Sequence, residues 1–221
     1  MMRFLNLPVA GRRAVIERQK ESVGLPGMSI EKDLWVTQVL HALFSLDVSD
    51  KLIFKGGTSL SKAWGLIERF SEDIDLAIDP VFLGAPVPVT TAVAGKTMVE
   101  KMFLLHELFS VEGHGMKAER KSRHLYDLYR MMNQPFAGEA LRDDVLWESI
   151  RHHREIYTSV SGMDYTPDVR KRMVLVPRAD IMENWRHDYE NMREAMIYGA
   201  KPTWEQLIDA MERLQKRVWS L

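Results

Sequence analysis

The stretch from Lys55 to Ile78, KGGTSLSKAWGLIERFSEDIDLAI, most constrains how this chain can fold. It follows the short apolar run Leu52–Phe54 and opens with the pair Gly56-Gly57. Residues Ser59–Ile67 have helical character, and Ile74–Ile78 alternates apolar and acidic residues as a strand does. We therefore expect a strand, a glycine turn, a helix and a second strand, in that order.

The glycine pair suits a bound phosphate group. Because glycine has no Cβ, backbone N–H groups can approach a ligand closely there. A following helix would direct the positive end of its dipole at the turn, and Thr58, Ser59 and Ser61 would add hydroxyl donors. The turn is therefore a candidate triphosphate site, although a glycine pair taken alone is equally the mark of an ordinary tight turn.

Two carboxylates follow the turn at a spacing that suits a metal ion. In a strand, Asp73 and Asp75 share one face, while Ile74, Leu76 and Ile78 share the other and enter the core. The two charges repel each other unless a cation lies between them. Mg²⁺ or Mn²⁺ accepts such oxygen ligands and still leaves room for substrate phosphates. The alternative is an acidic, solvated edge strand or turn.

Most of the chain after residue 95 is expected to be helical. The predicted helices are Thr97–Phe109, Ser122–Met132, Asp143–Ile156, Ile181–Met196 and Thr203–Trp219. A further buried helix is expected at Ile30–Phe44, with Ser29 as its N-cap, and residues 80–95 are expected to be loop or strand edge. The sequence thus predicts an α+β fold, with a mixed half at residues 1–95 and a helical domain at residues 96–221.

Composition excludes several classes of protein. With no cysteine, the chain has no disulfides, no thiolate catalysis and no cysteine-ligated zinc, so hard cations with oxygen ligands are favoured. A net charge of -1 provides no overall attraction for nucleic acid, so any such site must be a local patch. No apolar run is long enough to cross a membrane, and the N-terminus lacks the apolar core of a signal peptide, so we expect a cytoplasmic protein.

Several segments resemble a known family. FKGGTSLSKAWGLIERFSEDIDLAI, KTMVEKMFLLHE and RKSRHLYDLYRM, in that order, resemble the AbiEii/AbiGii-type nucleotidyltransferases, which are toxins of abortive-infection and toxin–antitoxin systems. IEKDLWVTQVLHALF and DYENMREAMIYGAKPTWEQLIDAMERL resemble family segments too, so the similarity spans nearly the whole chain. It implies a polymerase-β-like nucleotidyltransferase core with a mixed sheet, followed by a helical C-terminal domain. It also implies a nucleoside triphosphate (NTP) substrate, an RNA acceptor such as the 3′ end of tRNA, and a cognate antitoxin.

The resemblance also implies roles for individual residues. Gly56, Gly57 and Ser59 would hold the triphosphate, Asp73 and Asp75 the metal, while Lys101 would neutralise phosphate charge and Asp127 would match the last acidic motif. From the sequence alone, Lys101 could instead be a solvated helix residue, and Asp127 could cap its helix or pair with Arg123 or Arg130.

The chain departs from the family in one respect. Only residues 76–100 separate Asp75 from Lys101, whereas relatives place more chain and further strands between these motifs. Either the core is shortened here, or a segment is missing near Gly84–Pro88, where a break would show as a Cα step much longer than about 3.8 Å. A third metal carboxylate is therefore unassigned, with Asp79 and Asp127 both eligible.

Two basic clusters are candidates for RNA binding. The first contains Lys117, Arg120, Lys121 and Arg123, with His124 and Arg130 close by, and the second contains Arg151, His152, His153 and Arg154. Such local clusters attract a phosphate backbone even in a nearly neutral protein. The alternative is that they form salt bridges with Glu119, Asp127, Glu148 and Glu155.

The sequence leaves three functions open. The first is metal-dependent nucleotidyl transfer onto RNA by Asp73 and Asp75 with Lys101. A kinase-like transfer of the γ-phosphate is the second, and labelling with α- or γ-labelled nucleotide separates the two. The third is a non-catalytic nucleotide- or RNA-binding module, against which the intact set of motif residues argues.

Overall fold

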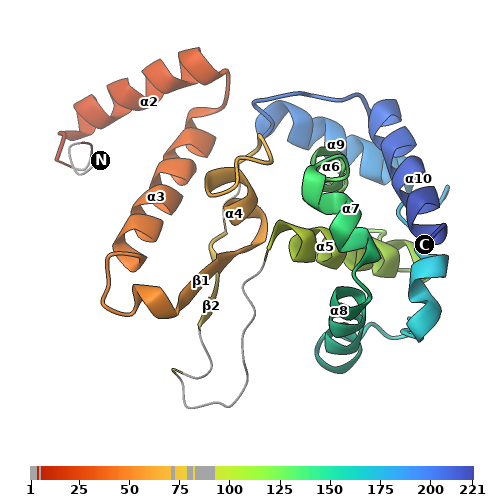
Figure 1. The fold of residues 1–221 in the computed structure, drawn as a ribbon. Coiled ribbons are helices and arrows are strands. Elements are labelled where there is room, and N and C mark those ends of the chain that lie inside the picture. Colours follow the sequence, from red (N-terminus) through yellow and green to blue (C-terminus); the bar gives the residue numbers. More distant parts are fainter. Residues whose placement is uncertain (1–3, 5, 71–72, 79–81, 83–92) are drawn as a thin grey trace. The chain divides into compact units, whose positions relative to one another are not determined.

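The structure is a computed structural model that describes residues 4, 6–70, 73–78, 82 and 93–221 (Figure 1). The chain separates into two compact units. Unit 1 contains the described residues of Met1–Ala92 together with Arg193–Lys201, and unit 2 contains Val93–Met192 and Pro202–Leu221. The chain thus returns to unit 1 for one short segment near its end. The division into domains at residues 95 and 96 stays a prediction.

Unit 1 begins with two helices, α2 (Val9–Val23) and α3 (Gly27–Leu43), which pack against each other. Gly24, in the left-handed conformation at φ 71°, ends α2. The helix expected at residues 30–44 is confirmed as α3, but two of its expected details are wrong. Pro26 occupies the N-cap position, so Ser29 lies inside the helix. Val36 is the single buried residue of α3, and the other residues are half-buried or exposed.

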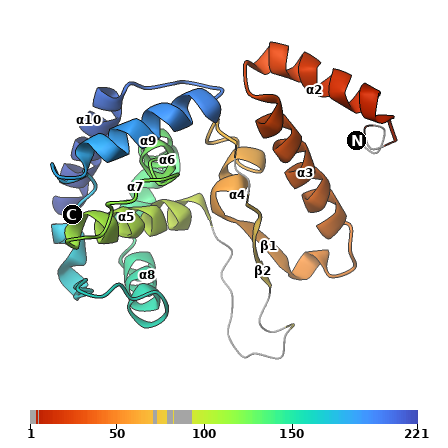
Figure 2. The same cartoon turned by 180° about the vertical axis from the view of Figure 1, so that it is seen from behind.

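A two-stranded antiparallel sheet follows, with β1 (Leu52–Lys55) paired to β2 (Asp75–Ile78). The short helix α4 (Gly56–Lys62) starts directly after β1 and contacts both strands (Figure 2). The predicted order of strand, glycine turn, helix and strand is therefore confirmed. The short helix η1 (Ser49–Lys51) precedes β1.

Two details of this region differ from the prediction. The helix ends at Lys62 instead of Ile67, because the chain turns back at Gly65, which has a φ of 61°, and the Leu66 N–H donates to the Leu60 carbonyl at 2.8 Å. In β2, Ile78 is 44% exposed instead of buried, since only two strands are present among the described residues and the outer end of the pair is uncovered.

Unit 2 is a helical bundle arranged around α5 (Ala94–Ser110), which contacts α6 (Arg123–Met131), α7 (Pro135–Arg142) and α8 (Asp144–Tyr157). The helix α10 (Trp204–Trp219) packs on α6 and on η2 (Pro167–Arg172). In the chain, α9 (Met182–Ala195) lies between η2 and α10. The five helices predicted after residue 95 are confirmed to within three residues at each end, whereas α7 and η2 were not predicted.

Interlocked aromatic and polar contacts fix the bundle. The rings of Phe109 and Trp185 meet at 4.7 Å, and the Trp185 indole N–H donates to the Gly115 carbonyl at 2.8 Å. Thr203 and Gln206 form a capping box at the start of α10. In the part of the chain that the structure describes, no helix has both the length and the apolar content needed to span a bilayer.

The short spacing between Asp75 and Lys101 falls partly on residues that the structure does not describe. The proposed break near Gly84–Pro88 and most of the loop expected at residues 80–95 lie outside the described residues, and so does Asp79. At the end of that range, residues 94 and 95 already belong to α5 instead of a loop.

Candidate functional site

The glycine turn and the acidic motif meet in unit 1. The strand register pairs Lys55 with Asp75, which brings the start of β2 beside the turn. A Cβ built on Gly56 would overlap the Asp75 carboxylate and lie 2.8 Å from its Cγ. Gly56 also has a φ of 77°, which side chains rarely adopt. Both facts require glycine at this position, so the two motifs form one cluster.

Two buried hydroxyls stabilise the turn, and one of them connects it to the acidic motif. Thr58 is 1% exposed, and its Oγ1 donates a hydrogen bond to the Asp73 carbonyl. Ser59 is 2% exposed, and its Oγ donates to the Gly56 carbonyl at 2.8 Å. These hydroxyl protons are therefore used within the protein. The direct contact of Thr58 and Ser59 with a triphosphate stays a prediction, and the observed bonds give both residues a part in shaping the turn.

The carboxylates themselves are accessible. Asp73 lies just before β2 and Asp75 is its first residue, and both are exposed while Ile74 between them is half-buried. This alternation matches the predicted face over residues 73–76, although it breaks at Ala77.

The donor chemistry of this cluster fits a hard divalent cation. Two exposed carboxylates beside a glycine turn provide oxygen ligands and leave open positions for water or phosphate oxygens. Among the described residues, no group of three or more acidic or histidine side chains gathers closely enough to hold a metal alone. Asp73 and Asp75 would therefore supply part of a coordination shell.

Lys101 and Asp127 form a buried ion pair in unit 2. The Lys101 Nζ lies 2.9 Å from the Asp127 Oδ2, and the two residues are 8% and 0% exposed. The His124 Nδ1 is 3.3 Å from the same Nζ. The solvated-lysine alternative is therefore wrong, and α5 and α6 bring together two residues that the sequence separated by a loop.

His106, on the same helix as Lys101, has a structural environment. It is 3% exposed, and its Nδ1 lies 3.1 Å from the Val174 N–H and 2.7 Å from the Ser110 Oγ. Because Val174 donates to Nδ1, that nitrogen accepts and the ring is neutral. Burial lowers the pKa of His106 to about 4, with a smaller contribution from the charge of Arg172.

The first basic cluster lies on the loop that leads into α6, and Asp188 on α9 anchors this loop. Lys117 and Arg120 are exposed, while Lys121 and Arg123 are half-buried. The Asp188 carboxylate on α9 accepts hydrogen bonds from the backbone N–H of Arg120 at 2.7 Å and of Ser122 at 3.0 Å, and also from the Ser122 hydroxyl. Arg120 has a φ of 60°, which is uncommon outside glycine.

This anchor was not predictable from the sequence. Asp188 is far from the loop in the chain, and one aspartate among the acidic residues of a helix carries no local signal. The predicted basic residues are thereby presented by an ordered loop of unit 2.

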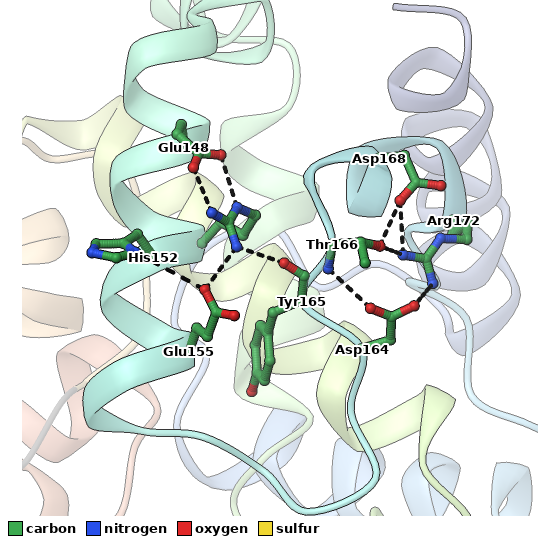
Figure 3. A network of polar contacts seen from close by, with 9 residues as sticks. Glu148, His152, Glu155, Asp164, Tyr165, Thr166, Asp168 and Arg172 are labelled. Atoms are coloured by element: carbon green, nitrogen blue, oxygen red, sulfur yellow. Dashed lines mark hydrogen bonds and ion pairs between the residues drawn. The ribbon is translucent and has the colours of Figure 1, made fainter.

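The second basic cluster is used internally. The Arg151 guanidinium donates to Glu148 and Glu155 on its own helix and to the Tyr165 carbonyl at 2.6 Å. Figure 3 labels these three partners. Arg154 forms two hydrogen bonds to the carboxylate of buried Glu107. The salt-bridge alternative is therefore confirmed for Arg151 with Glu148 and Glu155, whereas Arg154 pairs with Glu107, which was not among the expected partners.

Comparison with known proteins places the chain in a family. The family model for the nucleotidyl transferase AbiEii toxin, type IV toxin–antitoxin system, matches residues 38–93 and 79–210. No curated protein and no solved structure matches the chain. The matched residues include the glycine turn, Asp73, Asp75, Lys101 and Asp127. Since they make up well over half of its length, the chain belongs to the AbiEii family of nucleotidyltransferase toxins.

Proposed function

We propose that this nucleotidyltransferase moves a nucleotide from an NTP onto RNA, at the 3′ end of tRNA, and that this modification is its toxic activity. The observation that carries the proposal is the close approach of Gly56 and the Asp75 carboxylate, which joins the glycine turn to the acidic motif. A cognate antitoxin would counteract the activity, as the family description implies.

The reaction needs little covalent chemistry from the protein. The acceptor hydroxyl attacks the α-phosphorus, a new O–P bond forms, the bond to the bridging oxygen breaks, pyrophosphate departs, and the hydroxyl proton passes to solvent. A divalent ion held by Asp73 and Asp75 would neutralise phosphate charge and favour ionisation of that hydroxyl. The backbone N–H groups at Gly56 and Gly57 would approach the phosphates, because neither glycine has a side chain of its own.

Lys101 would supply positive charge toward the triphosphate. Its ammonium is held by Asp127, so the side chain has one preferred direction instead of many. Asp127 is fully buried and paired with Lys101, and this environment favours a role in orienting the lysine over a role as third metal ligand. Asp79 then becomes the better candidate for that ligand.

The RNA would bind the basic loop that contains Lys117, Arg120 and Lys121, together with Arg123 at the start of α6. The internal pairing of Arg151 and Arg154 supports this assignment, because it removes the competing basic cluster from consideration. A nearly neutral molecule with a local basic loop attracts an RNA backbone to one place.

Labelling tests this function directly. Purified protein is incubated with Mg²⁺, total RNA and each NTP in turn, labelled at either the α- or the γ-phosphate. We expect an α-labelled NTP to label small RNA and a γ-labelled NTP to leave the RNA unlabelled. The Asp75→Asn variant should transfer no label from the α-labelled NTP. Transfer of γ-label would indicate a kinase-like reaction, and label on protein alone would exclude RNA as acceptor.

A further inference from the structure

A short segment near the end of the chain lies along the residues that lead into the acidic motif. The Phe70 N–H donates to the Met196 carbonyl at 3.1 Å, and the Tyr198 N–H donates to the Glu68 carbonyl at 3.0 Å. Arg69 and Ile197 form an antiparallel β-bridge between these bonds. We call residues 68–70 and 196–200 the clasp, and all of them belong to unit 1.

Side chains reinforce the clasp. The Glu68 carboxylate accepts a hydrogen bond from the Ala200 N–H at 3.2 Å. The rings of Phe70 and Tyr198 meet at 5.4 Å. Ile197 is 0% exposed. The two segments are therefore packed as a small piece of sheet with its own core, although they lie far apart in the sequence.

Arg69 belongs to this packed interior. It is 1% exposed, and its guanidinium donates to the Phe70 carbonyl at 3.1 Å. A guanidinium enclosed in this way holds backbone instead of meeting a substrate phosphate. The enclosure therefore favours a structural role for Arg69.

Gly199 is required by the clasp. A Cβ built on Gly199 would overlap the Glu68 side chain, including its carboxylate. The glycine thus resembles Gly56, where a carboxylate also lies in the space that a side chain would fill.

Residues 68–70 of the clasp closely precede the proposed metal carboxylates in the sequence. Phe70, its last residue on this side, precedes Asp73 by three positions, and the Asp73 carbonyl is held by Thr58. We infer that the clasp positions Asp73 and Asp75, with Glu68 and Gly199 as positioning residues. This inference rests on the proposed function, in which the two carboxylates hold the divalent ion.

The test compares the full-length chain with its Gly199→Ala variant. Mn²⁺ binding is followed by electron paramagnetic resonance without nucleotide, and hydrogen exchange is followed in peptides that cover residues 73–78. We expect Mn²⁺ affinity to fall about tenfold, as is usual when residues behind metal ligands are changed, and exchange at residues 75–78 to accelerate. Gly11→Ala is the matched control, because its new Cβ would lie no closer than 3.4 Å to any neighbour.

A folded Gly199→Ala variant with unchanged Mn²⁺ affinity and unchanged exchange would overturn the inference. If that variant does not fold, Glu68→Ala takes its place, since it removes the acceptor for Ala200 without adding atoms, and the same two measurements decide. If wild-type protein binds no Mn²⁺, the proposed metal function fails, while the exchange measurement still shows whether the clasp orders residues 73–78.

Discussion

At the scale of single residues, Asp73 and Asp75 carry the proposed chemistry. Both are exposed, so replacing either by Asn removes a metal-ligand charge without disturbing a core. We expect each variant to lose transfer activity and to keep or slightly raise its melting temperature, because the repulsion between the carboxylates is relieved. Labelled transfer and thermal melts measure the two effects. Wild-type turnover with normal Mg²⁺ dependence in either variant would show that the metal assignment is wrong.

Gly56 allows a prediction with an internal control. Gly56→Ala adds both a left-handed strain and a clash with Asp75, whereas Gly65→Ala, at φ 61°, adds a Cβ that meets no atom within 4 Å. Left-handed strain alone costs about 1–2 kcal/mol. In urea unfolding we expect Gly65→Ala to lose that much and Gly56→Ala to lose more, with transfer abolished only in the latter. If both variants lose the same free energy of unfolding, Asp75 moves away from the new Cβ at no cost in stability.

His106 predicts how stability depends on pH. The unfolded histidine takes up a proton below its usual pKa of 6.5, but the folded one stays neutral until about pH 4. Stability is therefore fully present above pH 6.5 and declines as the pH falls toward 4, by about 3 kcal/mol in total from this residue. Urea unfolding at pH 7 and pH 4.5 measures the decline. His106→Gln should show a smaller one, and an equal decline in both proteins would assign it to other groups.

At the scale of elements, the sequence predicted what depends on local periodicity. The helices α5, α6, α8 and α10 have an apolar stripe, and α10 also has its capping residues Thr203 and Gln206, so both their type and their ends were predictable. The short helix α7 has too few turns for a periodic signal. The many apolar residues of α3 suggested a buried helix, but only Val36 is buried there.

The parts of the site that are close in sequence were predictable too. Gly56 and Asp75 flank one hairpin-like unit, so pattern reading brought them together. The partners Asp188 and Gly199 act across long stretches of chain, and only tertiary structure reveals contacts of that kind. The pairing of Arg151 with Glu148 was among the alternatives, because helical spacing makes it local.

Asp188 gives the prediction that belongs to this scale. Asp188→Ala removes an acceptor shared by two backbone N–H groups and one hydroxyl, at roughly 1–3 kcal/mol. We expect faster hydrogen exchange in peptides covering residues 117–123 and weaker RNA labelling, with little change in the affinity for free NTP. Asp209→Ala is a suitable control, because Asp209 is an exposed helix residue with an ion pair at four residues' spacing. Unchanged exchange at residues 117–123 would contradict the anchor role.

At the scale of the whole molecule, charge is balanced overall and uneven locally. The net charge is -1, and Arg151, Arg154 and Arg170 are paired with carboxylates within unit 2. The two stretches that match the family overlap at residues 79–93, the same segment in which the spacing between motifs is short. The predicted shortening of the core between Asp75 and Lys101 therefore falls on the segment that both matched stretches share.

We expect RNA to be attracted mainly to the loop that contains Lys117, Arg120 and Lys121. Each phosphate contact lowers the logarithm of RNA affinity by about 0.7–0.9 per decade of salt. Replacing the three residues together by Gln should weaken RNA labelling and reduce the salt slope by about 2, if most of the three contact phosphate. Binding of free NTP should change little, because the triphosphate turn lies elsewhere in the sequence.

The control is a triple variant with the same change in charge at a different place. Arg13, Arg18 and Lys20 are exposed on α2, so replacing them by Gln alters the net charge equally without touching the loop. RNA labelling measured from low to high salt should separate the two variants, with a flattened slope only in the loop variant. If both variants weaken labelling to the same extent, the effect is one of total charge, and the loop is not the RNA site. Normal labelling by the loop variant across the whole salt series would exclude it outright.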